Sequence, residues 1–179
     1  TLVASHLILA LQSIASRNVD PIEQVVVSVT SFETSSKAFN VIPERVFLRG
    51  TVRNMQPASR DMAEKRILEM SHLTAETYGA VAEAQYIRSY PVMSNSPEQT
   101  AFAAEVATKV MGKCGEASLV MGGEDFSFML EERPGAYILL GNGDSAPIHT
   151  ERYNFNDEII PAGCSWFAEI AEQRMLPGR

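Results

Sequence analysis

Two short stretches of this chain combine residue types that could take part in chemistry. Residues 122–125 read Gly-Gly-Glu-Asp and lie between apolar segments. Adjacent glycines let the backbone approach a ligand closely. A helix that begins at Asp125, with Phe126, Met129 and Leu130 on its buried side, would follow a short strand. A strand that ends in a flexible acidic turn is a common way to build a ligand site. The second stretch is the loop around His149, which has Glu151, Asp157 and Glu158 nearby.

Each stretch also has an ordinary structural interpretation. Two glycines followed by acids occur in loops where an acidic side chain caps a helix, and a single loop histidine is often a hydrogen-bonded structural residue. A zinc site needs three or four ligands, and the sequence has no His-x-Cys or His-x-x-x-His pair. If His149 binds a metal, most ligands must come from elsewhere. No Gly-x-Ser-x-Gly nucleophile motif or phosphate-binding glycine loop is present in the sequence.

Composition narrows the possible partners and compartments. The net charge is −7 and lysines and arginines do not cluster, which argues against nucleic acid and anionic membranes as partners. No apolar run approaches the roughly 20 residues that span a bilayer. Cys114 and Cys164 fit free thiols in a reducing cytoplasm, with a single disulfide as the alternative. We therefore expect a cytoplasmic globular protein.

The first half of the chain predicts a small α+β domain. Helical spacing covers residues 2–17, and alternating apolar residues predict strands at 25–32 and 45–53. A helix from 57 to 78 follows, with Ser59 as its cap and Gly79 as its stop, and then a strand at 81–88. This order matches a ferredoxin-like fold without its first strand, an antiparallel sheet with two helices on one face. Arg49 and Arg53 would share the other face, which is either simply solvated or able to bind an anion.

The second half predicts an α/β portion. The polar, proline-containing stretch from 89 to 97 is the best boundary, giving domains at 1–89 and 90–179. Ser96 and Gln99 form a capping box for a helix that Gly112 ends. Short buried strands are expected at 119–121 and 136–140, and a last helix at 162–175 with Phe167 among its core residues.

Several motifs occur together in one order along the chain. They are residues 11–21 (LQSIASRNVDP), 40–43 (NVIP), 50–53 (GTVR), 122–127 (GGEDFS), and His149 with 156–158 (NDE). As a set they resemble the C-terminal half of M20 family metallopeptidases, in the branch that contains aminoacylase-like and hippurate-hydrolase-like amidohydrolases.

The resemblance implies a two-domain enzyme that cleaves small N-acyl amino acids or similar amides. An α/β catalytic domain would hold divalent ions (Zn, Mn, Co or Ni), two in the complete enzyme, and metal-activated water would attack the amide with a glutamate as base. Residues 1–89 would be the lid, which usually forms a homodimer. His149 matches a metal ligand. The positions that match substrate-binding residues are Asn40, Arg53, Gly122, Gly123, Glu124 and Asp125.

The sequence also departs from the family pattern. The family's His-x-Cys-Gly-His-Asp motif, its Glu-Glu pair and a further histidine would lie before Thr1, so we expect no catalytic residue in this chain and no activity from it alone. The N-terminal portion of such an enzyme is absent from the sequence given. The alternative is a non-catalytic remnant that serves only in dimerisation or interaction.

Overall fold

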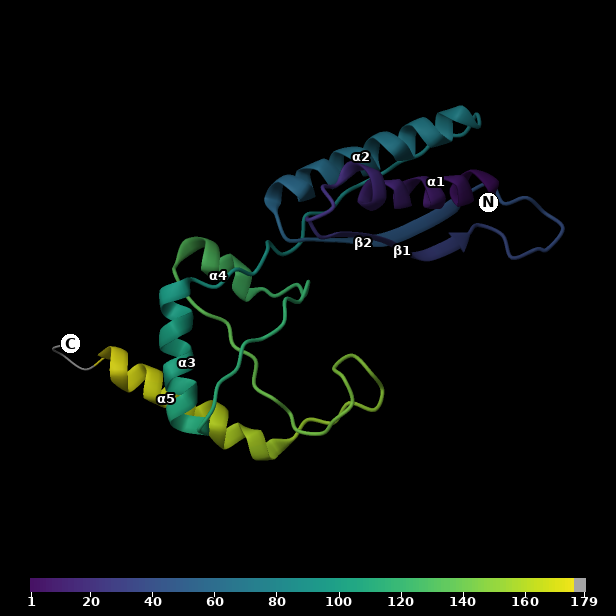
Figure 1. The fold of residues 1–179 in the computed structure, drawn as a ribbon. Helices are drawn as coiled ribbons and strands as arrows, with labels where there is room; N and C mark the ends of the chain where they lie inside the picture. Colours follow the sequence, from purple (N-terminus) through teal and green to yellow (C-terminus); the bar gives the residue numbers. More distant parts are fainter. Residues whose placement is uncertain (176–179) are drawn as a thin grey trace. The chain divides into compact units, whose positions relative to one another are not determined.

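The computed structural model describes residues 1–175, which form two compact units (Figure 1). The first unit comprises residues 1–92 together with 121–123, and the second comprises the rest of the described chain. Among the described residues, no helix combines the length and apolarity that a bilayer crossing needs. The chain passes between the two units three times, once within the Gly-Gly-Glu-Asp stretch.

The first unit is a two-stranded antiparallel sheet with helices. Its elements are α1 (Leu2–Ser13), a π-helical turn (Ile14–Asn18), β1 (Val25–Thr34), β2 (Val46–Asn54) and α2 (Pro57–Thr77). The strands pair from Val25 opposite Asn54 to Thr34 opposite Val46, with a bulge between Val29 and Ser31. Gly50 lies beside this bulge, where a Cβ would come within 2.4 Å of the Ser28 carbonyl oxygen. Only glycine fits there without moving β1.

One apolar cluster holds the first unit together. Leu11, Ile14, Val27 and Ala63 are buried against one another, so α1, its π-helical turn and α2 all cover the same face of the sheet (Figure 1). The alternation of valines in β1 produces this inner face because successive side chains point to opposite sides of a strand. Arg49 on the opposite face is exposed. The predicted antiparallel sheet with two helices on one face is confirmed.

Glycine ends α2 as predicted, but the predicted cap at its start is wrong. Gly79 has φ +68°, its N–H donates to the Glu76 carbonyl (3.0 Å), and Ala80 N–H donates to the Ala75 carbonyl (2.9 Å). This is a Schellman motif. At the other end, Pro57 begins the helix because its fixed φ suits the first helical position. Ser59 is instead buried inside the helix, where its hydroxyl donates to the Glu23 carboxylate.

The predicted strand at 81–88 is not formed. This segment carries no regular secondary structure, and Arg88 at its end pairs with Asp61 (2.7 Å) and Glu64 on α2. Arg60 also donates to the Ser89 carbonyl (3.1 Å). A strand needs a neighbouring backbone for its hydrogen bonds, and no described residue supplies one here. Side chains of α2 bind the segment instead.

The second unit consists of helices and non-regular connections. Its elements are α3 (Pro97–Met111), α4 (Phe126–Glu132), a 3-10 turn (Asp157–Ile159) and α5 (Ile160–Met175). The Ser96 hydroxyl accepts a hydrogen bond from the Gln99 N–H (3.5 Å), and Gly112 ends α3 with φ +76°. The predicted Ser96 cap and Gly112 stop are therefore confirmed, but the capping box is not complete, because the Ser96 N–H donates to the Gly135 carbonyl (2.9 Å) and not to the Gln99 side chain. The last helix begins two residues earlier than predicted.

Helices α3 and α5 pack through small residues on α3. Ala103, Val106 and Ala107 are buried, and the Trp166 indole donates to the Ala103 carbonyl (3.1 Å). The prediction that Phe167 belongs to the core is wrong, since it is 68% exposed. Because α5 meets α3 through its Trp166 side, the neighbouring position points to solvent.

The predicted strands at 119–121 and 136–140 are also absent among the described residues. The second of these segments has a side-chain partner instead. Asn95 donates through Nδ2 to the Tyr137 carbonyl (2.9 Å) and accepts from the Tyr137 N–H through Oδ1 (2.8 Å). One carboxamide thus makes the two bonds that a neighbouring strand would make.

Candidate functional site

The acidic turn leads directly into helix α4. Asp125 is the residue before the first helical residue, as predicted, but its carboxylate makes no capping bond. Ser127 is fully buried, and both its N–H (3.2 Å) and its hydroxyl donate to the Glu124 carbonyl. Met129, predicted to be buried, is exposed. The side of α4 that packs against the acidic turn therefore carries the small Ser127, whereas Met129 points to solvent.

Gly123 is tightly enclosed in the first unit. A Cβ at this position would lie 3.0 Å from Arg53 Nη1 and 3.0 Å from Tyr90 Cδ2. Few real Cβ atoms have neighbours this close, so the absence of a side chain lets the guanidinium and the ring approach the backbone. The structure thus brings together Arg53 and Gly123, two of the predicted substrate-binding residues.

Tyr137 connects the acidic turn to the segment that leads towards His149. Its ring lies 5.9 Å from that of Phe126. Burial, followed by the negative charge of Glu124, raises the pKa of the Tyr137 phenol above its ordinary value. The phenol therefore keeps its proton to a higher pH than an ordinary tyrosine does.

His149 occupies a turn and has an unusual backbone conformation. It is the only non-glycine residue with positive φ in the described chain, at φ 65°. Its side chain is exposed. On either side, Thr150 Oγ1 donates to the Pro147 carbonyl (2.8 Å) and Tyr153 N–H donates to the Thr150 carbonyl (3.1 Å). A left-handed conformation is unfavourable for a residue with a Cβ, and such strain often marks a functional position.

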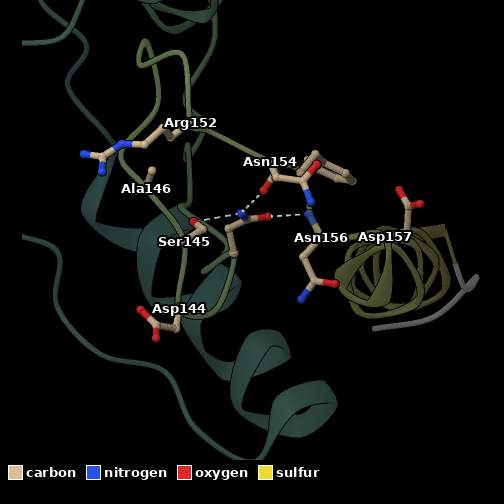
Figure 2. Close-up of a pocket in the computed structure, with 9 residues that line it drawn as sticks. Asp144, Ser145, Ala146, Arg152, Asn154, Asn156 and Asp157 are labelled. Atoms are coloured by element: carbon tan, nitrogen blue, oxygen red, sulfur yellow. Dashed lines mark hydrogen bonds between the residues drawn. The ribbon is translucent and has the colours of Figure 1, made fainter.

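A polar pocket of about 570 Å³ lies in the same loop (Figure 2). Its lining residues are Asn142, Asp144, Ser145, Ala146, Arg152, Asn154, Phe155, Asn156 and Asp157. The Asn142 carboxamide lines the pocket and is hydrogen-bonded to both sides of the loop. Reasoning from the sequence missed Asn142. The available signal was the Gly-Asn-Gly run directly after the apolar segment, because asparagine side chains often bond to nearby backbone in turns.

The predicted site residues are divided between the two units. Asn40, Arg53, Gly122 and Gly123 belong to the first unit, whereas Glu124, Asp125 and His149 belong to the second. Asn40 is exposed in the loop between β1 and β2. Among the described residues, no three histidine, cysteine, aspartate or glutamate side chains lie close enough together to hold a metal ion. His149 is thus a single candidate ligand, and these residues do not by themselves fit a metal centre.

Comparison with known proteins decides the family. A model of peptidase family M20/M25/M40 matches residues 5–173. The chain belongs to this family. Hippurate hydrolase of Campylobacter jejuni is 34% identical over 171 residues, covering 94% of this chain and 44% of that protein. N-acetylcysteine deacetylase of Bacillus subtilis is 29% identical over 168 residues, with the same coverage of each chain. The M20 chain described here therefore spans less than half the length of these curated relatives.

Solved structures agree with the family assignment. The YXEP protein of Bacillus subtilis, described as a dinuclear metal-binding peptidase of the M20 family, superimposes with a TM-score of 0.76 at 26% identity. The match covers 97% of this chain and 45% of that protein. The two-stranded sheet and its helices therefore correspond to part of the M20 fold.

Proposed function

We propose that this chain forms part of a metal-dependent amidohydrolase that cleaves the amide bond of N-acyl amino acids or related conjugates. The family match and the relatives, a hippurate hydrolase and an N-acetylcysteine deacetylase, support this reaction class. The single geometric observation that carries it is His149, held at φ 65° where the family resemblance assigns a metal ligand. A divalent ion, when bound, would supply activated water for the hydrolysis.

The residues of this chain would serve in binding and positioning rather than in proton transfer. His149 would contribute one metal ligand, and the general base and other ligands would come from outside the sequence given. Arg53 supports the assignment of an anion-binding role, since its guanidinium reaches the Gly123 backbone and can pair with a carboxylate. On this proposal the chain alone hydrolyses nothing at a useful rate.

The test is expression of the complete gene that encodes this chain. Its product should hydrolyse hippurate or N-acetyl amino acids when supplied with Zn²⁺, Mn²⁺, Co²⁺ or Ni²⁺, whereas the 179-residue chain should not. His149→Ala should remove the activity and lower the bound metal measured by elemental analysis. His72→Ala is the matched control, because His72 is exposed on α2 and is not assigned to the site. Full activity in His149→Ala, or in the chain alone, would refute the proposal.

We also propose that residues 1–89 form the lid domain and that the protein is a homodimer through it. Two features support an association surface: Phe47 and Val26 are more than 40% exposed on the sheet, and β1 and β2 pair only with each other among the described residues. Light scattering on the purified chain should give the mass of a dimer. A strictly monomeric mass would count against this proposal, and against the alternative of a non-catalytic dimerisation remnant.

A further inference from the structure

The Asn142 carboxamide closes the loop that carries His149. Its Nδ2 group donates to the Ser145 hydroxyl (2.9 Å) and to the Asn154 carbonyl (2.8 Å). Its Oδ1 atom accepts from the Asn156 N–H (2.8 Å). Figure 2 shows these three bonds meeting at one side chain, from the two ends of the loop. A primary amide has two donor hydrogens and one acceptor oxygen. Both donor hydrogens and the acceptor oxygen of Asn142 are therefore hydrogen-bonded.

This pattern ties the start of the loop to its end. Asn142 bonds the carbonyl of residue 154 and the N–H of residue 156, which is how a peptide group of a neighbouring strand would bond. The Asn156 side chain adds a further hydrogen bond: its Oδ1 accepts from the Glu158 N–H (3.0 Å) in the 3-10 turn that precedes α5. The end of the loop is therefore fixed relative to both Asn142 and the following helix.

His149 lies midway between these closed ends. Within the described part of the chain, no hydrogen bond holds its imidazole ring, so its backbone alone decides where the ring lies. That backbone is in the left-handed region, which a residue with a Cβ occupies only when the surrounding structure enforces it. The nearby turn bonds are local, whereas Asn142 is the residue that joins the two ends.

We propose that Asn142 is a positioning residue that holds the 143–155 loop closed and thereby places His149. No other side chain of similar size can replace it, because aspartate keeps the acceptor but loses both donors, and leucine loses all three bonds. The consequence for metal binding rests on the proposed function, whereas the consequence for the loop does not. Asn142 does not itself touch the reacting atoms.

The loop is tested by NMR on the 179-residue chain. The positive φ of His149 gives a strong intraresidue NOE between its amide and α protons. In Asn142→Leu this NOE should weaken to the intensity of an ordinary residue, and the Asn156 amide should exchange with solvent about tenfold faster, as expected for one lost hydrogen bond. Asn142→Asp should weaken the same NOE, because the Asn154 carbonyl no longer has its donor. The Trp166 indole N–H signal should stay unchanged, which shows that α3 and α5 remain packed.

Asn154→Ala is the matched control, because residue 154 contributes only its backbone carbonyl to the bond with Asn142. This variant should leave the His149 signal and the Asn156 exchange rate unchanged. An unaltered His149 signal in Asn142→Leu, or an equal change in Asn154→Ala, would overturn the proposal.

A separate measurement addresses metal binding in the product of the complete gene. There Asn142→Leu should weaken retention of Zn²⁺ during dialysis by about tenfold, in the range seen for residues that support metal ligands. If Asn142→Leu opens the loop but His149→Ala retains its full metal content, the proposed function fails while the positioning role of Asn142 stands. If metal retention falls while the loop signals stay unchanged, the positioning role is overturned.

Discussion

The two units of this chain are held together by different kinds of interaction. In the first, backbone hydrogen bonds join β1 to β2 and an apolar cluster around Ile14 lies beneath them. In the second, apart from the packing of α3 on α5 and a backbone bond from the Ser96 N–H to the Gly135 carbonyl, side-chain amides hold the extended segments. Asn95 bonds both backbone groups of Tyr137, and Asn142 bonds the backbone of residues 154 and 156.

Among the described residues, these extended segments have no neighbouring strand, and side-chain amides make some of the bonds that such a strand would make. Backbone N–H and C=O groups need partners when they are shielded from water, and a carboxamide has the same donor and acceptor groups as a peptide. Asparagine can therefore replace one residue of a missing strand neighbour. It does so at single points, whereas β1 and β2 pair along their whole length.

The largest expected effect is in the apolar cluster of the first unit. Ile14→Ala removes a fully buried side chain and leaves a cavity, so it should lower the free energy of unfolding by about 2–5 kcal/mol. Urea denaturation followed by circular dichroism measures this change. Leu9→Ala is the control on α1, directly before the turn that contains Ile14. The Leu9 side chain is 69% exposed, so this variant should change stability by less than about 0.5 kcal/mol. Equal effects of the two variants would show that the cluster does not hold this unit together.

A smaller effect is expected from Asn95 in the second unit. Asn95→Ala leaves the Tyr137 N–H and carbonyl without their partner and should lower stability by about 1–3 kcal/mol. Asn95→Asp keeps the acceptor oxygen, so its free energy of unfolding should lie between those of Asn95→Ala and the unmodified chain. Trp166, the single tryptophan and a residue of this unit, reports the transition by fluorescence. A greater loss from Asn95→Ala than from Ile14→Ala would reverse the comparison between the units.

The backbone strain at His149 predicts that glycine at this position gives a more stable protein than alanine does. Because its φ is 65°, His149→Gly should be more stable than His149→Ala by about 1 kcal/mol. Thermal denaturation of the two variants measures the difference. At Thr150, which does not share the positive φ, the order should be reversed, since glycine there only adds flexibility to the unfolded chain. If alanine is the better residue at 149 as well, the loop is not held in the left-handed conformation.

The smallest expected effect concerns the charges between α3 and α5. Hydrogen bonds from Gln173 and then Lys109 lower the pKa of the Glu169 carboxyl below its ordinary value. Because the pKa of Glu169 is lower in the folded state, its ionised carboxylate stabilises the fold. This stabilisation is complete above the ordinary glutamate pKa and is lost as the pH falls through the lowered value. Gln173→Leu and Lys109→Met should each raise the pKa in a ¹³C NMR titration. The effect on stability should be slight because the pair lies at the surface. An unchanged Glu169 pKa in both variants would show that these hydrogen bonds do not form in solution.

Local sequence patterns predicted most of the regular elements. The valine alternation in β1, Gly79 after α2, and Ser96 with Gly112 around α3 each act through residues next to them in the chain. Such signals depend on backbone sterics and capping, which do not require a distant partner. The family resemblance came from the order of several such short motifs, and the family match confirmed it.

The predicted strands at 81–88, 119–121 and 136–140 failed for the opposite reason. Apolar, β-branched sequence makes a segment suitable for a strand, but a strand exists only when another backbone lies beside it. Nothing in the local sequence reveals whether that neighbour is present. The same limit applies to Phe167 and Trp166, because helical spacing defines a face without identifying which neighbour that face will meet.

The sequence by itself therefore determined the helices, the glycine-terminated ends of α2 and α3, the paired strands and the family. It also identified His149 and the 122–125 turn as candidate positions, whose roles stay predictions. Only the tertiary structure decided that Arg53 approaches Gly123, that Asn142 closes the His149 loop, and that His149 has a left-handed backbone. These features arise from contacts between residues distant in the chain or from the closure of a whole loop. A sequence motif specifies a residue type, but such contacts fix where its atoms lie.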